Sequence, residues 1–273
     1  MSGGMPKLSR ADGLPVRSLG FGGTTETEPR MIDRAHRCGI DYFFFYSLAF
    51  KGMVEGLSRF CKTHREGIVV ATGEESRDRD SLVKSRDGAL QALGTEYLDI
   101  FYLEYVAPGE PAEDIDRALA EVAQWKESGI IRYVGASAHD RALAARLAET
   151  GQVDVLMHRY NMAHRRSEAT VLPRAEAAGV PVVAFTCTRW GSLPKGHQDW
   201  GGPAPTAKDC YRFALSHAAV EVALTAPASL AELNENVGLV EEAVMSDSEK
   251  ADWSRYGDLV YGDGMDAFET RWP

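Results

Sequence analysis

Short apolar runs alternate with amphipathic stretches of helical length along the whole chain. Runs rich in Val, Ile, Phe and Tyr are typical of strands that are buried on both faces. The pattern predicts strands at Ser18–Gly22, Tyr42–Tyr46, Ile68–Thr72, Ile100–Glu104, Tyr133–Ser137, Val153–Met157, Val182–Thr186 and Val220–Thr225. Between them, apolar residues recur at the spacing of one helix face. Helices are predicted at Glu28–Arg37, Ala112–Ser128, Arg141–Thr150, Glu168–Ala178, Ala207–Ser216 and Leu230–Val244.

Eight predicted strands that alternate with helical segments favour an α/β fold, the (β/α)8 TIM barrel. An open, doubly wound sheet is the main alternative, but the turn after its first strand should read GxGxxG, and "GFGGTTE" does not. No repeat or linker divides the chain, so we expect one domain over residues 1–273. The Gly/Pro-rich segment Gly191–Thr206 follows the seventh strand and is expected to form a lid or substrate loop over the C-terminal mouth.

Composition narrows the class of partner. The net charge is −10, and the longest basic run, His164–Arg166, is too short for a nucleic-acid surface, so nucleic acid and anionic membranes are disfavoured. No apolar run has the length of a membrane span, and the N-terminal segment lacks the apolar core of a signal peptide. The four cysteines lie far apart without a CxxC pair, which favours free thiols and no metal site. We therefore expect a cytoplasmic protein with a small-molecule ligand.

Several longer segments resemble the aldo-keto reductases, and they occur in the same order. "LGTEYLDIFYLE" resembles their Leu-Gly-Thr-Asp-Tyr-Ile-Asp-Leu-Tyr-Leu-Leu-His, and "ESGIIRYVGAS" resembles their Gly-Lys-Ile-Arg-Tyr-Ile-Gly-Val-Ser. "AHRCGIDYFFF", "RYNMAHR" and "RFALSHAAVEVALTAPASLAELNEN" are similar to the family at the second strand, the sixth strand and the cofactor helix. "GLPVRSLGFGGT" resembles its N-terminal hairpin. The resemblance implies a TIM barrel whose bottom is closed by an N-terminal β-hairpin.

The resemblance also implies a tetrad of Asp, Tyr, Lys and His at the strand ends, in which Tyr protonates the substrate carbonyl as hydride arrives from NADPH. At the four positions this chain has Phe44, Ala49, Gly73 and Glu104. None of the four residue types is kept, so the proton donor and the groups that lower its pKa are missing from these positions. Standard carbonyl reduction by the tetrad is therefore disfavoured.

A cofactor site implied by the resemblance is kept in part. Ser137 corresponds to the serine that holds the nicotinamide amide, and Phe185 to the aromatic residue that stacks on the nicotinamide ring. Glu235 and Asn236 correspond to a pair near the adenine. Glu232 stands where the family binds the extra phosphate of NADP, and a carboxylate repels that phosphate. NADP(H) binding by the usual contacts is disfavoured, NAD(H) stays compatible, and the cofactor is left open.

Glu104 ends the fourth predicted strand, and we expect its side chain to point into the barrel mouth. A carboxyl surrounded by Phe44, Tyr46 and Met157 is desolvated, which raises its pKa and suits it to general acid or base catalysis near neutral pH. The alternative is a structural ion pair with Arg159, which lies two residues after Met157 on the same side of the sixth strand.

Two further residues are catalytic candidates. Tyr46 shares the inward face of the second strand with Phe44 and could supply a phenol proton donor. His139 directly follows the fifth strand, where an imidazole could shuttle protons. The alternative is that His139 or Asp140 caps the helix that begins at Arg141, and Asp140 is the better cap.

A ligand-binding role is predicted for a set of aromatic and basic residues near the mouth. Arg189 and Trp190 in "CTRWGS" stand where the family binds pyrophosphate, and an Arg over a Trp suits an anionic or planar ligand. The alternative is a stack that anchors the loop. The expected substrate-binding residues are these two together with Phe44, Met157 and Arg159.

Three functions are compatible with these residues. The first is a small-molecule enzyme that uses Glu104 for acid/base catalysis of an elimination, isomerisation or cyclisation. The second is an NAD(P)H-dependent oxidoreductase in which Glu104 or Tyr46 is the proton donor. The third is a non-catalytic ligand-binding protein. The first is favoured, because ionisable groups remain at a mouth that has lost the residues of the tetrad.

Overall fold

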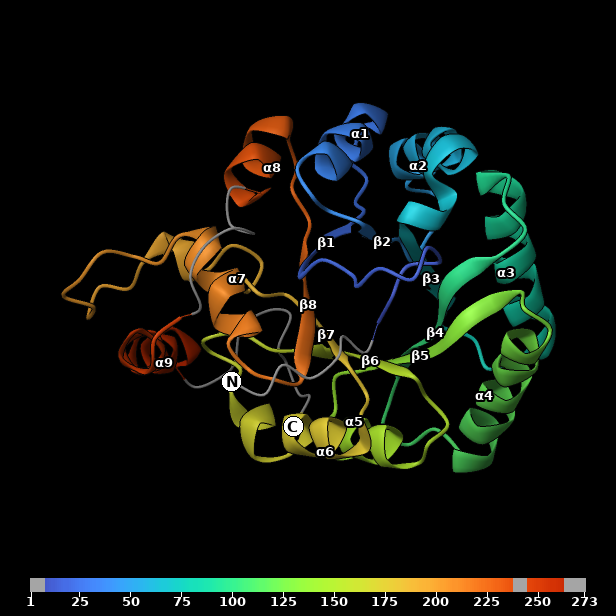
Figure 1. Cartoon of the computed structure of the whole chain (residues 1–273). Helices are drawn as coiled ribbons and strands as arrows, with labels where there is room; N and C mark the ends of the chain where they lie inside the picture. The colour runs from blue at the N-terminus through green and yellow to red at the C-terminus, as the bar shows by residue number, and fades with distance from the viewer. Residues whose placement is uncertain (1–7, 238–244, 263–273) are drawn as a thin grey trace.

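The computed structural model describes residues 8–237 and 245–262, and its eight parallel strands form a closed barrel in sequence order. Figure 1 shows the helices as a ring around these strands. The predicted TIM barrel is therefore confirmed. The strands are β1 (Leu19–Gly22), β2 (Tyr42–Phe44), β3 (Val69–Glu74), β4 (Leu98–Val106), β5 (Ile131–Ala138), β6 (Val155–Arg159), β7 (Val182–Phe185) and β8 (Val220–Thr225).

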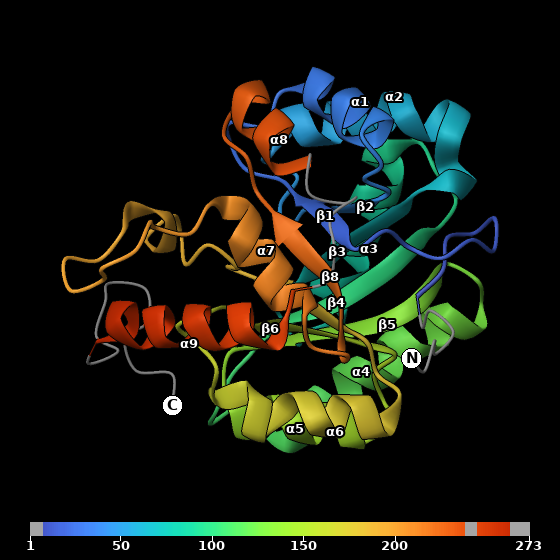
Figure 2. The ribbon, with the colours of Figure 1, turned by 60° about the vertical axis from the view of Figure 1, so that its left-hand side comes forward.

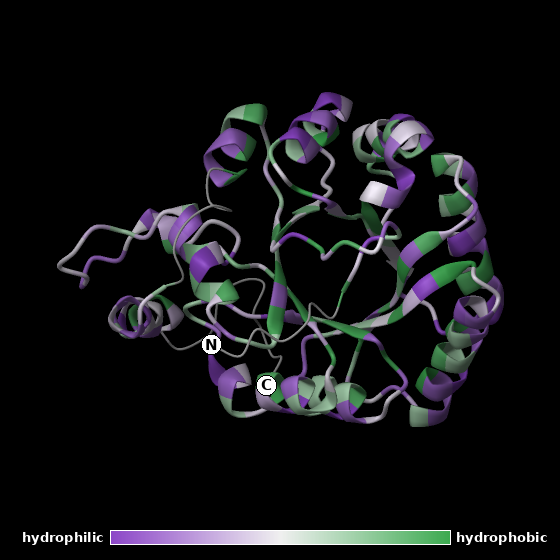
Figure 3. Cartoon of the chain, viewed as in Figure 1, coloured by the Kyte–Doolittle hydropathy of each residue, from purple (hydrophilic) through white to green (hydrophobic). Residues whose placement is uncertain are grey.

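The helices that connect the strands are amphipathic, and in Figure 3 most of them carry both hydrophobic and hydrophilic residues. The α-helices are α1 (Pro29–Arg37), α2 (Lys51–His64), α3 (Arg79–Leu93), α4 (Ala112–Glu127), α5 (Arg141–Glu149), α6 (Val171–Ala178), α7 (Ala207–Leu215), α8 (Leu230–Val237) and α9 (Asp247–Tyr261). Short 3-10 helices are η1 (Arg65–Gly67), η2 (Arg166–Ala169) and η3 (Leu193–Lys195). Of the predicted helix that ends at Val244, residues 238–244 lie outside the described residues.

Side-chain caps fix the starts of two helices at the mouth. Asp140 accepts a hydrogen bond from the Leu143 amide at 2.7 Å and begins α5, as predicted. Thr206 begins α7 through a capping box. Helix α6 begins at Val171 rather than at Glu168, because the chain first forms the 3-10 turn η2.

Large inward side chains fill the barrel interior. Tyr42 and Tyr102 are fully buried there, and their hydroxyl oxygens are 2.8 Å apart in a hydrogen bond. Neighbouring glycines give them space, since a Cβ on Gly135 would collide with the ring of Tyr102 and one on Gly20 would lie 2.9 Å from Tyr42. The barrel is therefore a packed core, and the open site lies above it at the C-terminal mouth.

The bottom of the barrel is closed by the first described residues. Leu8 and Val16 pack against the inner core, and Ser9 pairs with Pro15 in an antiparallel bridge. The predicted hairpin is thus present as a single bridge. It is held to the barrel by Arg132, which donates a hydrogen bond to the carbonyl of Ser9 at 2.8 Å.

Buried charges at the bottom are paired. Asp99 is fully buried, and its carboxylate lies 2.7 Å from Arg65 and 2.8 Å from Arg132. The amide of Val70 also donates to it at 2.9 Å. Because Arg132 also bonds the hairpin, this network joins the hairpin, β3, β4 and β5.

The predicted lid, Gly191–Thr206, connects β7 to α7 and packs beside α9. The rings of Trp200 and Tyr256 are 5.3 Å apart, and the Tyr256 hydroxyl donates to the carbonyl of Leu193 at 2.5 Å. Figures 1 and 2 show the tip of the loop projecting away from the barrel, near α9. Only the two ends of the segment approach the mouth, so its role as a lid stays a prediction.

Candidate active site at the barrel mouth

A cavity of about 1130 Å³ opens at the C-terminal ends of β1, β2, β7 and β8 and reaches α8. Six aromatic residues line it, namely Phe44, Tyr46, Phe50, Phe185, Trp190 and Tyr211. Tyr46 and Trp190 are 56% and 44% exposed, so they form its rim. A concave, aromatic cavity of this kind suits a small organic molecule. We call it the large cavity.

Tyr46 lines the large cavity, but the predicted placement on a strand is wrong. Strand β2 ends at Phe44, so Tyr46 is outside the alternation that would put it on the inward face. The chain turns after it because Ser47 accepts hydrogen bonds from the amides of Ala49 and Phe50, each at 3.1 Å. The Tyr46 ring packs edge-on against Phe50, with centroids 4.7 Å apart.

The end of the large cavity at α8 is acidic. Glu232 and Glu235 line it, and no lysine or arginine is among the described residues of its wall. The Glu232 carboxylate accepts a hydrogen bond from the amide of Ala228 at 2.9 Å, and Ser229 caps the amide of Glu232 at 3.2 Å. The start of α8, where an external anion would bind, therefore already holds a carboxylate of its own chain.

These residues do not fit the phosphates of a nicotinamide dinucleotide, because carboxylates repel phosphate. Asn236 lines the cavity, but its amide donates to Thr225 at 2.9 Å. The Ser137 hydroxyl accepts from the Tyr105 amide at 2.9 Å, and Ser137 is not part of the cavity wall. Of the predicted cofactor residues, Phe185, Glu235 and Asn236 thus share one cavity with Phe44, and their cofactor roles stay predictions.

Arg189 and Trp190 point in different directions. Both have left-handed backbone conformations, with φ of 51° and 50°. Trp190 lines the large cavity, whereas Arg189 is buried and donates to the carbonyl of Val260 on α9. The alternative role of Arg189 as a loop anchor therefore fits the structure better. Met157 lies in the inner core of the barrel and does not line the large cavity.

Glu104 lies near the end of β4, two positions beyond the inward-facing Tyr102. It is 6% exposed, and its Oε1 has no hydrogen-bond partner within the described residues. The pKa of this carboxyl is raised to about 8, chiefly by burial and also by the charges of Glu75 and Glu74, while Arg77 acts in the opposite direction. At neutral pH the carboxyl therefore holds its proton in most molecules.

The alternative for Glu104, an ion pair with Arg159, is wrong. Glu104 forms no ion pair within the described part of the chain, and β5 separates its strand from that of Arg159. Glu104 packs instead against β3, where a Cβ on Gly73 would lie 2.5 Å from its Oε1. The missing side chain at Gly73 is what gives Glu104 its space.

The four positions expected to correspond to the tetrad do not form a cluster of polar groups. Phe44, Gly73 and Glu104 lie at or near the ends of β2, β3 and β4, whereas Ala49 is exposed in the loop before α2. Their correspondence to the tetrad stays a prediction.

A smaller cavity of about 330 Å³ lies at the ends of β5 and β6, and we call it the basic cavity. His139 and Arg159 line it. The His139 ring packs edge-on against Phe185 and also contacts Tyr105, with centroids 5.0 and 4.9 Å apart. Because Phe185 lines the large cavity, the His139–Phe185 pair is a wall between the two cavities. His139 thus sits beside the mouth, and Asp140 is the helix cap.

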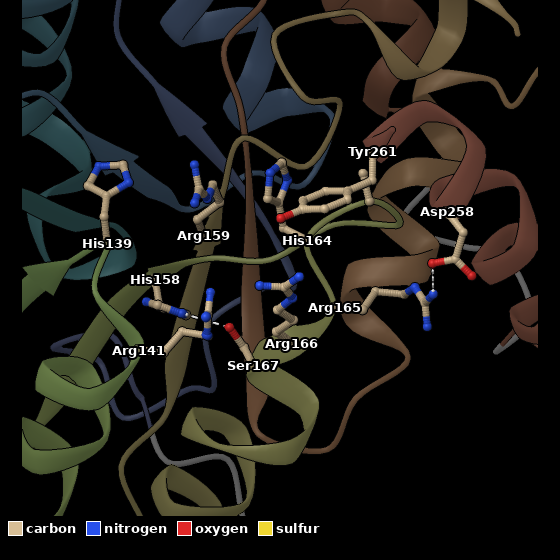
Figure 4. A pocket seen from close by; sticks show the side chains of 11 residues that line it. His139, Arg141, His158, Arg159, His164, Arg165, Arg166, Ser167, Asp258 and Tyr261 are labelled. Atoms are coloured by element: carbon tan, nitrogen blue, oxygen red, sulfur yellow. Dashed lines mark hydrogen bonds and ion pairs between the residues drawn. The ribbon is translucent and has the colours of Figure 1, made fainter. Parts of the chain in front are cut away.

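Sequence reasoning missed most of the basic cavity. Arg141, His164, Arg165 and Arg166 also line it, and they come from the start of α5 and from the loop after β6 (Figure 4). The one available signal was the short run from His164 to Arg166, which becomes significant only when the fold brings other arginines beside it.

Other kinds of site are missing from the described part of the chain. It contains no group of three or more His, Cys, Asp or Glu side chains arranged to hold a metal ion. None of its helices combines the length and the apolar character needed to cross a membrane. Cys187 lines the large cavity as a free thiol, and burial raises its pKa to about 12, so it is not a nucleophile at neutral pH.

A closed (β/α)8 barrel with a cavity at its C-terminal mouth has the architecture of TIM-barrel enzymes. The profile of the Aldo/keto reductase family matches residues 25–209, and this chain belongs to that family. L-glyceraldehyde 3-phosphate reductase of Escherichia coli is 32% identical over 209 aligned positions, which cover 66% of this chain and 60% of that protein. Aldo-keto reductase AFTS1 of Alternaria alternata is 30% identical over 125 positions, or 43% of this chain and 32% of that protein. The match therefore spans about a third to three fifths of these relatives.

Solved structures share the fold. An aldo-keto reductase from Bacillus halodurans in its holo form superposes with a TM-score of 0.78 at 20% identity, covering 93% of this chain and 96% of that one. An aldo/keto reductase from Klebsiella pneumoniae in complex with NADP and acetate gives a TM-score of 0.75 at 18% identity, covering 91% and 94%. At these identities the likeness shows the barrel alone.

Proposed function

We propose that this protein is a small-molecule enzyme in which Glu104 acts as general acid and base, in a reaction of the elimination, isomerisation or cyclisation type. The observation that carries the proposal is a buried carboxyl with a pKa of about 8 and no ion pair within the described residues. Near neutral pH such a group exists in both protonation states, so it can donate a proton to a substrate oxygen and recover one later in the turnover.

The surroundings of Glu104 support this role. Phe44 lines the large cavity and packs edge-on against Tyr102, the residue below Glu104 on the inward face of β4, with centroids 5.8 Å apart. Glu104 is not itself among the residues that line the large cavity, so the proposed role requires that a substrate reach its carboxyl past Phe44. Tyr46 on the rim and His139 on the wall between the cavities are the candidate partners for a second proton transfer.

A reductase is the second candidate. Relatives carry reductase names, among them the NADH-specific methylglyoxal reductase of Escherichia coli, 24% identical over 185 aligned positions that cover 59% of this chain and 56% of that protein. Phe185, expected to stack on a nicotinamide, lines the large cavity. In this case Glu104 or Tyr46 supplies the proton. The acidic end of the cavity at Glu232 and Glu235 argues against a dinucleotide there, so we place this candidate second.

The two candidates separate in one assay. Methylglyoxal and L-glyceraldehyde 3-phosphate, the aldehydes in the names of two relatives, are incubated with the protein with and without NADH and NADPH. Conversion without nucleotide supports acid/base chemistry, and conversion only with nucleotide supports the reductase. In either case Glu104→Gln should lower the rate about 10²–10⁴-fold, since it removes the proton donor. Glu113→Gln, an exposed carboxylate on α4, is the matched control and should leave the rate unchanged.

The pH profile adds a second readout. If the protonated form of Glu104 is required, the rate should fall about tenfold per pH unit above the pKa of about 8. A Glu104→Gln variant that turns over either aldehyde like the wild type contradicts the proposal. If the wild type converts neither aldehyde, native mass spectrometry of the purified protein can identify a retained ligand. The turnover of that ligand by wild type and by Glu104→Gln is then compared in the same way. A ligand released unchanged would favour a non-catalytic binding protein.

A further inference from the structure

The basic cavity is positively charged although the protein is acidic. The chain has a net charge of −10, yet the described residues that line this cavity include four arginines and one carboxylate. The arginines come from three separate segments, with Arg141 at the start of α5, Arg159 at the end of β6, and Arg165 and Arg166 in the following turn. The fold, rather than a local run of sequence, therefore brings them together.

The one carboxylate of the wall is already neutralised. Arg165 forms an ion pair with Asp258 of α9, and its Nε donates to the carbonyl of Met162 at 2.9 Å. Figure 4 shows Arg165 turned toward Asp258 and away from the other arginines. This pair joins α9 to the loop after β6, and no second carboxylate is among the described residues that line the cavity.

Two of the other arginines have no carboxylate partner among the described residues. Arg141 is half-buried and forms no ion pair there, and Arg166 is exposed, with its guanidinium 5.6 Å from the ring centre of Tyr261. Arg159 reaches the same cavity from the barrel and is 6% exposed. Figure 4 shows the three side chains around a common space. Guanidinium groups bind planar and tetrahedral oxyanions through paired hydrogen bonds.

The neighbouring histidine reports the same electrostatic field. His158 is buried and its Nε2 is 2.8 Å from the Ser167 hydroxyl. Desolvation lowers its pKa to about 4, and the positive charges of Arg159, His139 and Arg141 contribute to the shift. His158 is therefore neutral at pH 7. The cations that disfavour a proton on His158 favour an anion in the adjoining space.

We propose that the basic cavity binds the oxyanion group, a phosphate or a carboxylate, of a small-molecule ligand through Arg141, Arg159 and Arg166. Its volume of about 330 Å³ corresponds to roughly ten water molecules at ~30 Å³ each. It therefore has room for the oxyanion and a few attached carbon atoms.

The position of the basic cavity connects it to the active site. His139 and Phe185 form its wall toward the large cavity, where Glu232 and Glu235 repel anions. A molecule with one charged and one neutral end is therefore oriented with its oxyanion among the arginines and its neutral end toward the mouth. The inference rests on the proposed function only in assigning this molecule as the substrate of Glu104.

Binding is tested with inorganic phosphate and with acetate as separate probes, by calorimetric titration of the full chain at constant ionic strength. Wild type should bind at least one of them saturably, and the tighter probe identifies the oxyanion. Arg141→Gln and Arg166→Gln should each weaken binding about tenfold, since one charge-assisted hydrogen-bond partner is lost. The double variant should weaken it about a hundredfold.

Control variants test whether anion binding depends on the arginines of the basic cavity or on any positive charge at the surface. Arg59→Gln and Arg79→Gln remove two exposed arginines of α2 and α3 and should leave phosphate binding unchanged. The inference is overturned if neither probe binds saturably, or if the Arg141–Arg166 double variant binds as tightly as the wild type while its melting temperature without probe shows that it is folded. Glu104 does not line this cavity, so Glu104→Gln should bind phosphate normally. Failure of the anion site and failure of the proposed function thus appear in different assays.

Discussion

The two ends of β4 carry buried acidic residues in opposite surroundings. At the bottom of the barrel, Asp99 lies between Arg65 and Arg132, 2.7 and 2.8 Å away. At the mouth, Glu104 is also buried, but it has no ion pair within the described residues, and its pKa is raised to about 8. Transfer of a charge out of water costs several kcal/mol. Two guanidinium groups offset that cost for Asp99, whereas Glu104 keeps its proton instead.

This difference follows the division of roles within the barrel. Residues at the bottom of a TIM barrel serve stability. Here Arg132, the ion-pair partner of Asp99, also donates a hydrogen bond to the carbonyl of Ser9 in the hairpin. The mouth is where TIM-barrel enzymes bind their substrates, and an acidic group with a raised pKa at that position is a candidate for acid/base chemistry. A buried acidic residue is thus held by ion pairs at one end of β4, whereas the one at the other end is proposed to take part in chemistry.

The largest effect is expected at the bottom. Asp99→Asn leaves two poorly exposed guanidinium groups without their shared carboxylate, and should lower the free energy of unfolding by about 3–5 kcal/mol. Urea unfolding at pH 7 measures this. Asp114→Asn, which removes the carboxylate of an exposed pair with Arg117, should cost under about 1 kcal/mol. Equal losses in the two variants would show that the bottom network is no stronger than a surface pair, and the contrast with Glu104 would disappear.

At the mouth, the stability of the protein should depend on pH through Glu104. The folded protein keeps the Glu104 proton up to about pH 8, whereas the unfolded chain releases it near its ordinary pKa of 4.5. The folded state then binds more protons, so this group lowers stability as the pH rises, by at most about 1.4 kcal/mol per pH unit. Glu104→Gln removes this dependence. Its stability relative to wild type should therefore rise between pH 5 and 8 and stay level above that range.

The pH dependence of the stability difference is the informative quantity. A buried glutamine also changes the free energy of unfolding, but by an amount that does not vary with pH. Other titrating groups are common to both proteins and cancel in the difference. Unfolding free energies of wild type and Glu104→Gln are measured at four or more pH values by urea titration. Parallel curves would mean that Glu104 has an ordinary pKa in the folded protein, and the proposed function would lose its main support.

The barrel was predictable because its strands are apolar runs whose positions do not depend on distant parts of the chain. The prediction for β8 has the observed bounds, and the other strands differ only at their ends. The error at Tyr46 arises from a local competitor, the hydrogen bonds of Ser47, which end β2 early. A run of three phenylalanines conceals such a turn, since apolarity alone does not mark where a strand stops.

For the candidate site, the sequence predicts properties of single residues but not which residues lie next to one another. Glu104 is buried and its pKa is raised, but it lines neither the large cavity nor the basic cavity, so its role stays a prediction. Its neighbours depend on the order and register of the strands, and the alternative of an ion pair with Arg159 is wrong because β5 lies between the two strands. The basic cavity was missed for the same reason, because Arg141 and Arg166 are far apart in sequence and meet only in the fold.

The smallest effect in this comparison concerns the space that Gly73 gives to Glu104. Alanine at this position places a Cβ against the Tyr102 carbonyl and 2.5 Å from Oε1 of Glu104. We expect Gly73→Ala to lower the free energy of unfolding by about 1–3 kcal/mol, as other overpacked sites do, and to displace the carboxyl. Gly67→Ala, at a glycine with open space around its Cα, should change stability by less than about 1 kcal/mol. In the Glu104→Ala background the cost of Gly73→Ala should be smaller, because the collision with Glu104 is gone and only the one with the Tyr102 carbonyl remains. An unchanged cost in this double-mutant cycle would show that the backbone of Tyr102 alone requires the glycine.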